Sequence, residues 1–352
     1  MKNVAITTLN GYYNFGNRLQ LYALCRIINI YKFQVDNILL FSSKKRLILD
    51  KFNSIFCFDK EKKRLKNFYR FTHNNINVKN YFDVKINKKY NYFVVGSDQV
   101  WNYTFKEFNP IMFMNYANKE KNISYSASFG INDIPKDRIE EYKKGLNNIK
   151  YISVREDRGK ELVKEITGRD DAVVLVDPTM LLTVEEWDKV SKKPKMLKND
   201  KYILNYFLGE LSKERKDEIE RIARENDCEI INLLDKNSPF YVCGPSEFLY
   251  LEKHAFLICT DSFHSSVFAI LYNRPFVIFD REEKGMENMG SRLDTLINKF
   301  KLKNRRYNGK NITKENLEHD YSEAYKILEK ERKKSDEFLR EALDICGDKN
   351  ER

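Results

Sequence analysis

The sequence predicts an α/β protein built from two doubly wound halves, and three observations support this fold class. Short apolar runs that suit buried strands alternate with segments of helical apolar spacing, a pattern typical of parallel sheets covered by helices. A polar, charged, proline-containing stretch at residues 192–200 divides the pattern into two series. The chain has 352 residues, enough for two domains with separate cores. We therefore place a domain boundary at this stretch and expect a deep cleft between the halves.

The first half is predicted to open with a βα unit. Val4–Leu9 reads as a strand, a loop at residues 10–17 follows, and Arg18–Ile30 carries apolar residues at helical spacing. Four further apolar runs of this half read as strands, namely Tyr92–Val95, Ile123–Ser126, Tyr151–Val154 and Val173–Val176.

The second half repeats this alternation. Its predicted strands are Tyr202–Phe207, Glu229–Leu233, Ala255–Thr260 and Phe276–Phe279, and its predicted helices are Ser212–Asn226, Ser246–Lys253 and Ser265–Tyr272. Thr313–Cys346 reads as a helical tail with a heavily charged surface.

The composition is that of a globular protein without extended disorder. Hydrophobic residues make up 42% of the chain and charged residues 33%, with 13 glycines and 7 prolines. The first ten residues have too short an apolar core for a signal peptide, and no run approaches the length of a membrane span, so we expect a cytoplasmic protein. The cysteines form no CxxC pair and no zinc spacing, which predicts reduced thiols and no metal site; they are Cys25, Cys57, Cys228, Cys243, Cys259 and Cys346.

The net charge of +11 favours an anionic partner, which a membrane surface, a phosphorylated substrate or nucleic acid would each provide. Nucleic acid ranks last because the chain carries no nucleic-acid-binding motif. The densest basic stretch, Lys44–Arg70, is interleaved with aromatic residues and could rest on an anionic leaflet. A solvated helical hairpin whose aromatic residues pack on the domain is the favoured reading.

The strongest local signal is the stretch from Asp261 to His264, which lies between a predicted strand and a predicted helix. Ligands of parallel sheets lie beyond the carboxyl ends of the strands, so His264 is expected to face a ligand. The first turn of the helix also offers unpaired N–H groups and a positive dipole end to a phosphate or carboxylate. In the alternative reading, Asp261 or Ser262 merely caps the helix and His264 is a half-buried structural residue.

Two other loops follow predicted strands. The loop at residues 10–17 lacks the dinucleotide and P-loop fingerprints, but Asn14 and Asn17 offer amide groups to a hydroxyl-rich ligand. The alternative is a glycine turn that allows close helix packing. The segment Gly96–Trp101 combines polar side chains with an indole face that suits a sugar ring, unless Trp101 is buried in the core.

Three arginines are candidates for anion binding. Arg155 and Arg281 follow predicted strands, and Arg292 lies shortly beyond. Guanidinium groups at such positions suit bidentate binding of carboxylate or phosphate. Asp177, which precedes a proline, reads as part of a structural turn without a catalytic role.

These pieces together resemble the polysaccharide pyruvyl transferase family. No single motif is specific, but the set occurs in the expected order between about Val4 and Leu302. The matching stretches are Asn14–Gln20, Gly96–Asn102, Ser153–Glu156, Asp177–Thr179, Gly244–Glu247, Asp261–His264, Asn273–Phe276 and Ser291–Leu296.

The resemblance implies two Rossmann-like domains in a glycosyltransferase-B-like arrangement, with the active site in the cleft between them. Residues 1–195 would form the acceptor-side domain, residues 196–310 the donor-side domain, and residues 311–352 a helical tail that packs back on the first domain. It also implies transfer of the enolpyruvyl group of phosphoenolpyruvate onto two hydroxyls of a sugar, which gives a pyruvate ketal and phosphate.

The resemblance further implies roles for individual residues. His264 matches the active-site histidine and Arg155 the donor-binding arginine. Some members have an arginine where this chain has Ser262, and many have glycine where it has Ser265, so the donor needs another cation, for which we nominate Arg281 or Arg292. The expected donor contacts also include Asp261, Ser262, Phe263 and Ser265, and the expected acceptor contacts are Asn14, Gly16, Asn17, Ser97, Asp98, Gln99 and Trp101.

The expected chemistry is general acid/base catalysis by His264 without a metal or cofactor. Basic charge makes a polyprenyl-diphosphate-linked acceptor at the inner membrane face plausible. Two rival functions remain, a nucleotide-sugar glycosyltransferase of the same architecture and a non-catalytic sugar- or anion-binding protein. A dehydrogenase is disfavoured because the glycine fingerprint is missing.

Overall fold

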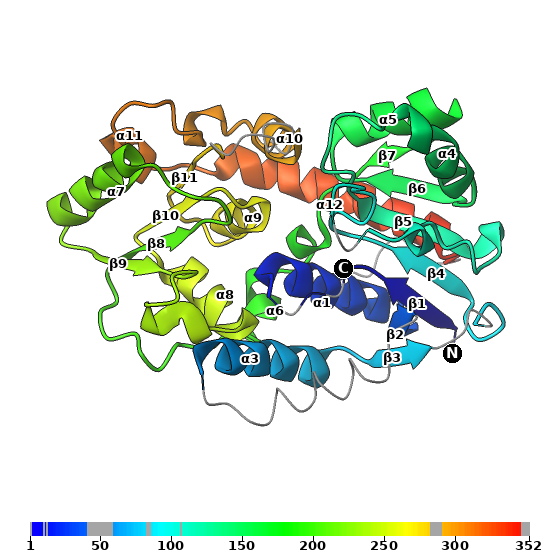
Figure 1. The fold of residues 1–352 in the computed structure, drawn as a ribbon, viewed down its shortest axis with the longest axis horizontal. Coiled ribbons are helices and arrows are strands. Elements are labelled where there is room, and N and C mark those ends of the chain that lie inside the picture. Colours follow the sequence, from blue (N-terminus) through cyan, green and yellow to red (C-terminus); the bar gives the residue numbers. More distant parts are fainter. Residues whose placement is uncertain are drawn as a thin grey trace.

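The computed structural model describes residues 2–9, 11, 13–40, 59–81, 86–105, 108–281 and 291–345, and it contains two parallel β-sheets (Figure 1). The first sheet has seven strands in the order β3-β2-β1-β4-β5-β6-β7. This is the doubly wound strand order, with its switch point between β1 and β4. The strands are β1 (Asn3–Thr7), β2 (Gln34–Leu40), β3 (Val78–Tyr81), β4 (Tyr92–Val95), β5 (Asn122–Ala127), β6 (Tyr151–Val154) and β7 (Val173–Val174).

The second sheet has four parallel strands in the order β11-β10-β8-β9, so its switch point lies between β8 and β10. The strands are β8 (Tyr202–Tyr206), β9 (Glu229–Asn232), β10 (Leu257–Thr260) and β11 (Phe276–Ile278). In the sequence, the strands of the first sheet precede the polar stretch at residues 192–200, and the strands of the second sheet follow it. The predicted α/β class with two doubly wound sheets is confirmed.

Helices cover both sheets (Figure 1). Several of them have local stop or start signals: α5 ends at Gly168, which adopts φ +76°, and α6 begins with a capping box formed by Thr183 and Glu186. The α-helices are α1 (Phe15–Ile30), α3 (Lys60–Asn75), α4 (Ile139–Asn147), α5 (Asp157–Thr167), α6 (Val184–Asp188), α7 (Lys213–Glu225), α8 (Pro245–His254), α9 (Phe263–Leu271), α10 (Ser291–Lys299), α11 (Lys314–Leu317) and α12 (Ser322–Ala342).

One apolar core cluster contains residues from both halves. Phe15 at the start of α1 stacks on Phe248 of α8, with ring centroids 4.6 Å apart. Trp187 of α6 lies edge-on to Phe268 of α9 at 5.1 Å. Because aromatic pairs of this kind bury large apolar areas, they fix how the strand ends of the two sheets face each other.

Only the second part of the basic stretch Lys44–Arg70 is described, and it belongs to α3 and the start of that helix. Leu65, Phe68 and Phe71 bury one face of the helix, as the packed-helix reading predicts. Arg64 crosses to the second half, where its guanidinium donates to the Tyr241 carbonyl at 2.9 Å. Residues 44–58 of the basic stretch lie outside the described residues. Among the described helices, none is both long and apolar enough to cross a bilayer.

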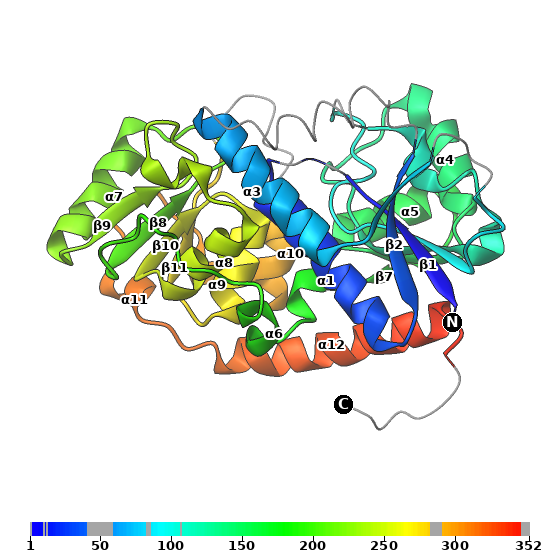
Figure 2. The same ribbon diagram turned by 90° about the horizontal axis from the view of Figure 1, so that it is seen from below.

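The described part of the tail from Thr313 is helical, as predicted, and contains α11 and α12. The long helix α12 runs beside the first sheet (Figure 2). From it, Arg332 donates to the carbonyls of Met180 and Leu182 at 2.8 and 3.0 Å, and Lys334 donates to that of Val174 at 2.9 Å. The helix thereby ties the C-terminus to the segment that carries Asp177.

Candidate active site

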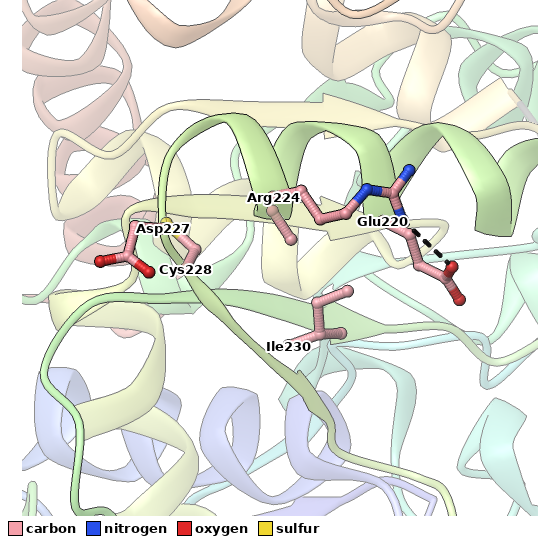
Figure 3. Close-up of a pocket in the computed structure, with 6 residues that line it drawn as sticks. Glu220, Arg224, Asp227, Cys228 and Ile230 are labelled. Atoms are coloured by element: carbon pink, nitrogen blue, oxygen red, sulfur yellow. Dashed lines mark ion pairs between the residues drawn. The ribbon is translucent and has the colours of Figure 1, made fainter.

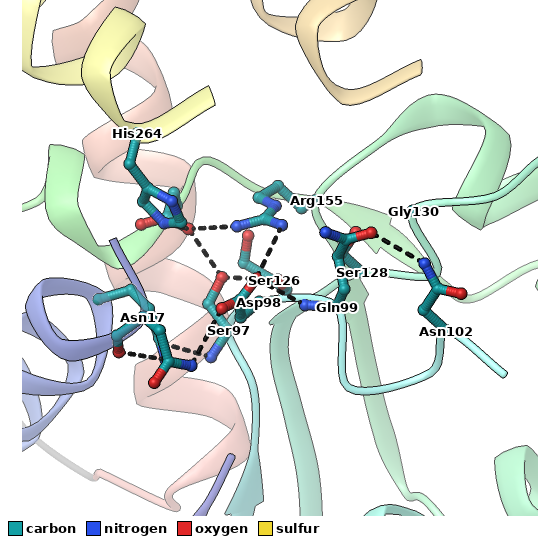
Figure 4. Close-up of polar contacts among 12 residues, drawn as sticks. Asn17, Ser97, Asp98, Gln99, Asn102, Ser126, Ser128, Gly130, Arg155 and His264 are labelled. Carbon is teal, nitrogen blue, oxygen red and sulfur yellow. Dashed lines mark hydrogen bonds and ion pairs between the residues drawn. The ribbon is translucent and has the colours of Figure 1, made fainter. Parts of the chain in front are cut away.

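The carboxyl ends of the two sheets meet at a cluster of buried polar side chains (Figure 4). His264 comes from the first turn of α9, directly beyond β10. Arg155 follows β6, Asp98 follows β4, and Asp177 lies beyond β7. The parallel order of both sheets brings these residues together, because all four follow strand ends that point to the same place.

Asp177 is the hub of the cluster, and the prediction that it is only part of a structural turn is wrong. Its Oδ2 accepts from Arg155 Nη1 at 2.9 Å and from Ser97 Oγ at 2.8 Å, and lies 3.5 Å from His264 Nε2. Its Oδ1 accepts from the backbone N–H and the hydroxyl of Thr179. Burial alone would raise the pKa of Asp177, but His264 and Arg155 outweigh it and hold the pKa well below its usual range.

The Arg155 guanidinium is buried, with 1% of its side chain exposed. Its Nη1 bonds to Asp177, while Nη2 lies 3.7 Å from Asp98 Oδ1. Among the described residues, Nε and Nη2 have no hydrogen-bond partner. The guanidinium lies over the Phe263 ring at 4.5 Å, which holds its plane in place. A buried cation with two nitrogen atoms that make no hydrogen bond is poised to bind an anion.

His264 is 6% exposed and is held on two sides. The 3.5 Å contact with Asp177 is long for a hydrogen bond, and within the described part of the chain Nε2 has no hydrogen-bond partner. Gly16 lies against the other edge of the ring, where a Cβ would overlap Nδ1. Gly16 is therefore needed for close approach of α1 to His264, as the alternative reading of the first loop proposed.

Asp98 and Asn17 join the loops at the switch point of the first sheet. Asn17 Nδ2 donates to Asp98 Oδ2 at 3.0 Å, and the Asn17 amide oxygen accepts from Arg18. Burial opposes ionisation of Asp98, but Arg155 and His264 outweigh it and lower its pKa. Asn14 caps α1 by accepting from the Asn17 N–H at 3.0 Å, so its predicted ligand contact is replaced by a local one.

Arg292, at the start of α10, reaches the same region. It is 8% exposed, and its Nε has no hydrogen-bond partner in the ranges that the structure describes. Burial, followed by repulsion from Arg155, lowers the pKa of Arg292 to about 10, so the group remains charged at neutral pH. The Gln99 amide lies between Asn102 Nδ2 at 2.9 Å and the Nη atoms of Arg292 at 3.2 Å, and in either orientation its nitrogen faces a donor. Arg292 is thus a second buried cation without a full set of acceptors.

Asp261 does not face a ligand with its carboxylate, in contrast to the predicted donor contact. Its Oδ1 accepts from the N–H of Leu208, and its Oδ2 accepts from the N–H of Gly209, both at 2.8 Å. Oδ2 also accepts from Arg281 Nε at 2.9 Å. Asp261 therefore anchors the loop after β8, and Arg281 supports that anchor.

Ser262 and Ser265 flank the histidine but differ in their surroundings. Ser262 is the N-cap residue of α9 and makes no side-chain cap hydrogen bond. The Ser265 hydroxyl donates to buried Glu252 at 2.6 Å, so the prediction of a donor contact through this hydroxyl is wrong. Burial raises the pKa of Glu252 well above its usual range. Ser265 and Glu252 thus form a buried contact between α9 and α8.

Trp101 is fully buried, so the prediction that its indole face binds a sugar is wrong. The ring packs on Phe113 and Phe129, with centroids 5.9 and 5.1 Å away. The large apolar indole is buried although polar residues flank it in the sequence.

We expect Trp101→Phe to lower the free energy of unfolding by roughly 1–3 kcal/mol without altering the KM for the acceptor, as measured by denaturation and steady-state kinetics. A raised acceptor KM in a stably folded variant would contradict this.

Elsewhere on the described surface, a hollow of about 540 Å³ lies between the end of α7 and the start of β9 (Figure 3). The hollow lies at the amino end of β9, opposite the carboxyl end that leads to the cluster of buried polar side chains. Its charged side chains include an exposed ion pair between Arg224 and Glu220 at 3.8 Å. We assign no function to this hollow.

In the described ranges, no group of three or more His, Cys, Asp or Glu residues forms a metal site, and Cys25, Cys228, Cys243 and Cys259 are free thiols.

Comparisons with known proteins show which family and which solved structures this chain resembles. The profile of the polysaccharide pyruvyl transferase family matches residues 14–283. No curated protein matches the sequence. Similar solved structures include the UDP-GlcNAc 2-epimerase of Methanocaldococcus jannaschii, with 15% identity, a TM-score of 0.46 and coverage of 93% of this chain and 98% of that chain. The UDP-GlcNAc 2-epimerase of Neisseria meningitidis bound to UDP-GlcNAc has 11% identity, a TM-score of 0.48 and coverage of 97% and 100%. A glycosyltransferase of Rickettsia africae has 12% identity, a TM-score of 0.47 and coverage of 98% and 100%.

The family match spans most of the chain and includes the hub and its neighbours. Asn17, Asp98, Arg155, Asp177 and His264 all fall inside the matched segment, whereas Arg292 lies beyond it. The chain therefore belongs to the polysaccharide pyruvyl transferase family.

Proposed function

We propose that this enzyme transfers the enolpyruvyl group of phosphoenolpyruvate onto two hydroxyls of a sugar in a polysaccharide or its lipid-linked precursor. The products are a cyclic pyruvate ketal and phosphate. One observation carries the proposal: among the described residues, buried nitrogen atoms of His264, Arg155 and Arg292 have no hydrogen-bond partner where the two sheets face each other. Phosphoenolpyruvate would supply the missing acceptors through its phosphate and carboxylate.

The donor site would be shared between the two halves. Arg155 comes from the first half, and Arg292 and the first turn of α9 come from the second. A guanidinium fork held by Asp177 and Phe263 suits one anionic group, and the N–H groups at the start of α9 suit another. We therefore propose a donor site built by residues of both halves, in place of a purely C-terminal donor domain.

In this proposal His264 moves the protons. Addition of two sugar hydroxyls to the enol carbon forms two C–O bonds and breaks the C–O bond to phosphate. One hydroxyl proton ends on the methylene carbon, which becomes a methyl group, and the other leaves with phosphate. His264 is suited to both transfers because its Nε2 makes no hydrogen bond to the described residues and the Asp177 carboxylate, 3.5 Å from it, stabilises a positively charged ring.

The acceptor would approach from the side of Asn17 and Asp98. Among the described residues, the Asp98 carboxylate accepts one hydrogen bond on each oxygen, from the N–H of Gln99 and from Asn17 Nδ2, and its Oδ1 also lies 3.7 Å from Arg155 Nη2. Each oxygen therefore retains a lone pair for a sugar hydroxyl. We propose no cofactor besides the donor substrate, and a lipid-linked acceptor at the inner membrane face remains our proposal for the source of the sugar.

The function is tested by incubating the enzyme with phosphoenolpyruvate and candidate glycan intermediates. We expect phosphate release that depends on the acceptor, and a product whose mass spectrum shows one added pyruvyl ketal. Transfer of a sugar from a nucleoside diphosphate sugar, with no phosphate release from phosphoenolpyruvate, would replace this function with that of a glycosyltransferase.

We propose Arg292, rather than Arg281, as the second arginine that binds the donor. We expect Arg292→Lys to raise the KM for phosphoenolpyruvate about tenfold, because lysine keeps the charge but loses the planar fork. Arg281→Lys should change it by less than about threefold, since Arg281 is bound to Asp261. Steady-state kinetics at saturating acceptor would reveal the reverse order if Arg281 were the ligand.

A further inference from the structure

Large apolar residues are rarely exposed on this protein, and their distribution is uneven. Among the described residues, the exposed large hydrophobic residues are Tyr13 at 57%, Leu208 at 44% and Ile30 at 45%. Ile30 ends α1, at the opposite end of the 16-residue helix from the candidate active site. Tyr13 and Leu208 instead lie in the loops that follow β1 and β8, the central strands at the two switch points. Exposed apolar residues gathered beside a site indicate a binding surface.

The loops of Tyr13 and Leu208 belong to the same neighbourhood as His264. Gly16, three residues after Tyr13, lies against the His264 ring. Phe15 and Tyr206, each two residues from the exposed pair, have ring centroids 5.6 Å apart. Each exposed residue thus lies within three residues of a group in this neighbourhood, Tyr13 in the first half of the protein and Leu208 in the second.

Each loop is held by a buried charged group. Arg64 donates from Nη2 to the Tyr13 carbonyl at 3.1 Å and from Nη1 to the Tyr241 carbonyl at 2.9 Å. Asp261 accepts from the N–H of Leu208 at 2.8 Å. An apolar residue on a loop anchored in this way pays little conformational entropy when it binds a ligand.

We propose that Tyr13 and Leu208 form the platform for the acceptor sugar, replacing the predicted role of Trp101. An aromatic ring beside an aliphatic side chain suits the C–H face of a hexopyranose, while the hydroxyls at its edge reach His264 and Asp98. This inference rests on the proposed function and adds the residues that select a pyranose ring as acceptor. Substitutions at these exposed positions cost the fold little, so their effects on binding can be measured directly.

The test is saturation-transfer difference NMR with a panel of methyl hexopyranosides of the gluco, galacto, manno and 2-acetamido types. We expect at least one sugar to receive saturation from the wild-type protein. Tyr13→Ala and Leu208→Ala should each weaken its binding about tenfold, the scale of one good aromatic contact. Tyr13→Phe, which keeps the ring, should bind within about twofold of wild type, and Ile30→Ala is the matched control for loss of an exposed apolar residue.

Two outcomes would overturn the platform: no sugar of the panel binds, or binding persists undiminished in both alanine variants. Phosphate release from phosphoenolpyruvate is measured in parallel. If sugars bind through Tyr13 but phosphate is never released, the proposed reaction fails and the platform stands. If phosphate is released and Tyr13→Ala binds sugar like wild type, the platform alone fails.

Discussion

Replacing His264 with asparagine is expected to lower kcat by about 10²- to 10⁴-fold, the usual contribution of a general acid/base. Asparagine keeps a polar side chain at the start of α9 but cannot shuttle a proton at neutral pH. Because Arg155 and Arg292 remain in place, the affinity for phosphoenolpyruvate should change by only a few-fold. Rates of phosphate release and donor titrations measure the two effects separately.

His319→Asn provides the matched control for this variant. His319 is half-buried in the loop after α11, where its Nε2 contacts the Asn273 carbonyl at 2.8 Å and its ring lies 5.0 Å from that of Tyr321, so the substitution should leave kcat unchanged. Wild-type kcat in the folded His264→Asn protein would remove the histidine from the proton-transfer steps.

Replacing Asp177 with asparagine is expected to affect both stability and activity. An amide nitrogen would face the donors Arg155 and Ser97, and Arg155 would lose its closest counterion. Removing one partner of a buried ion pair costs about 3–5 kcal/mol of unfolding free energy, and the misplaced arginine and histidine should lower kcat about 100-fold. Ser97→Ala removes a single neutral donor to the same oxygen and should cost only about 1 kcal/mol.

The stability difference between wild type and Asp177→Asn should depend on pH. The folded pKa of Asp177 lies well below its unfolded value, so the ionised carboxylate stabilises the fold fully above about pH 4. This contribution is lost as the pH falls from there toward the folded pKa, and the two proteins should become more similar. Denaturant titrations at pH 7 and in the acid range measure this change; an equal difference at both would contradict the assigned role.

Most of the strands could be predicted because they are short apolar runs with clear ends. The predicted Tyr92–Val95 and Tyr151–Val154 coincide with β4 and β6. β2 was missed because it contains Asp36 and Asn37, which disfavour strands. Tertiary contacts hold both residues in the strand: Tyr90 donates to Asp36 at 2.7 Å, and Asn37 Nδ2 donates to the Ile6 carbonyl at 3.1 Å. β3 is a short edge strand with little apolar pattern.

From the sequence, site residues could be placed beyond the ends of strands, but the contacts among their side chains could not be predicted. Local sequence placed His264, Arg155 and Asp98 beyond strands, and strand order then brings them together. Asp177 was missed because an aspartate before a proline also suits an ordinary turn, and only the contacts across the sheet distinguish its role. Trp101 could not be assigned from its neighbours, because burial of a side chain depends on the elements that pack over it.

We propose that His264, Arg155 and Arg292 together bind one small molecule that carries phosphate and carboxylate. The most direct measurement is a calorimetric titration of the protein with phosphoenolpyruvate, repeated for Arg155→Met and Arg292→Met, with a nucleoside diphosphate as the comparison ligand. We expect phosphoenolpyruvate to bind the wild-type protein and to bind each variant at least about tenfold more weakly. Binding of the nucleoside diphosphate alone, or phosphoenolpyruvate binding unchanged in both variants, would contradict the account.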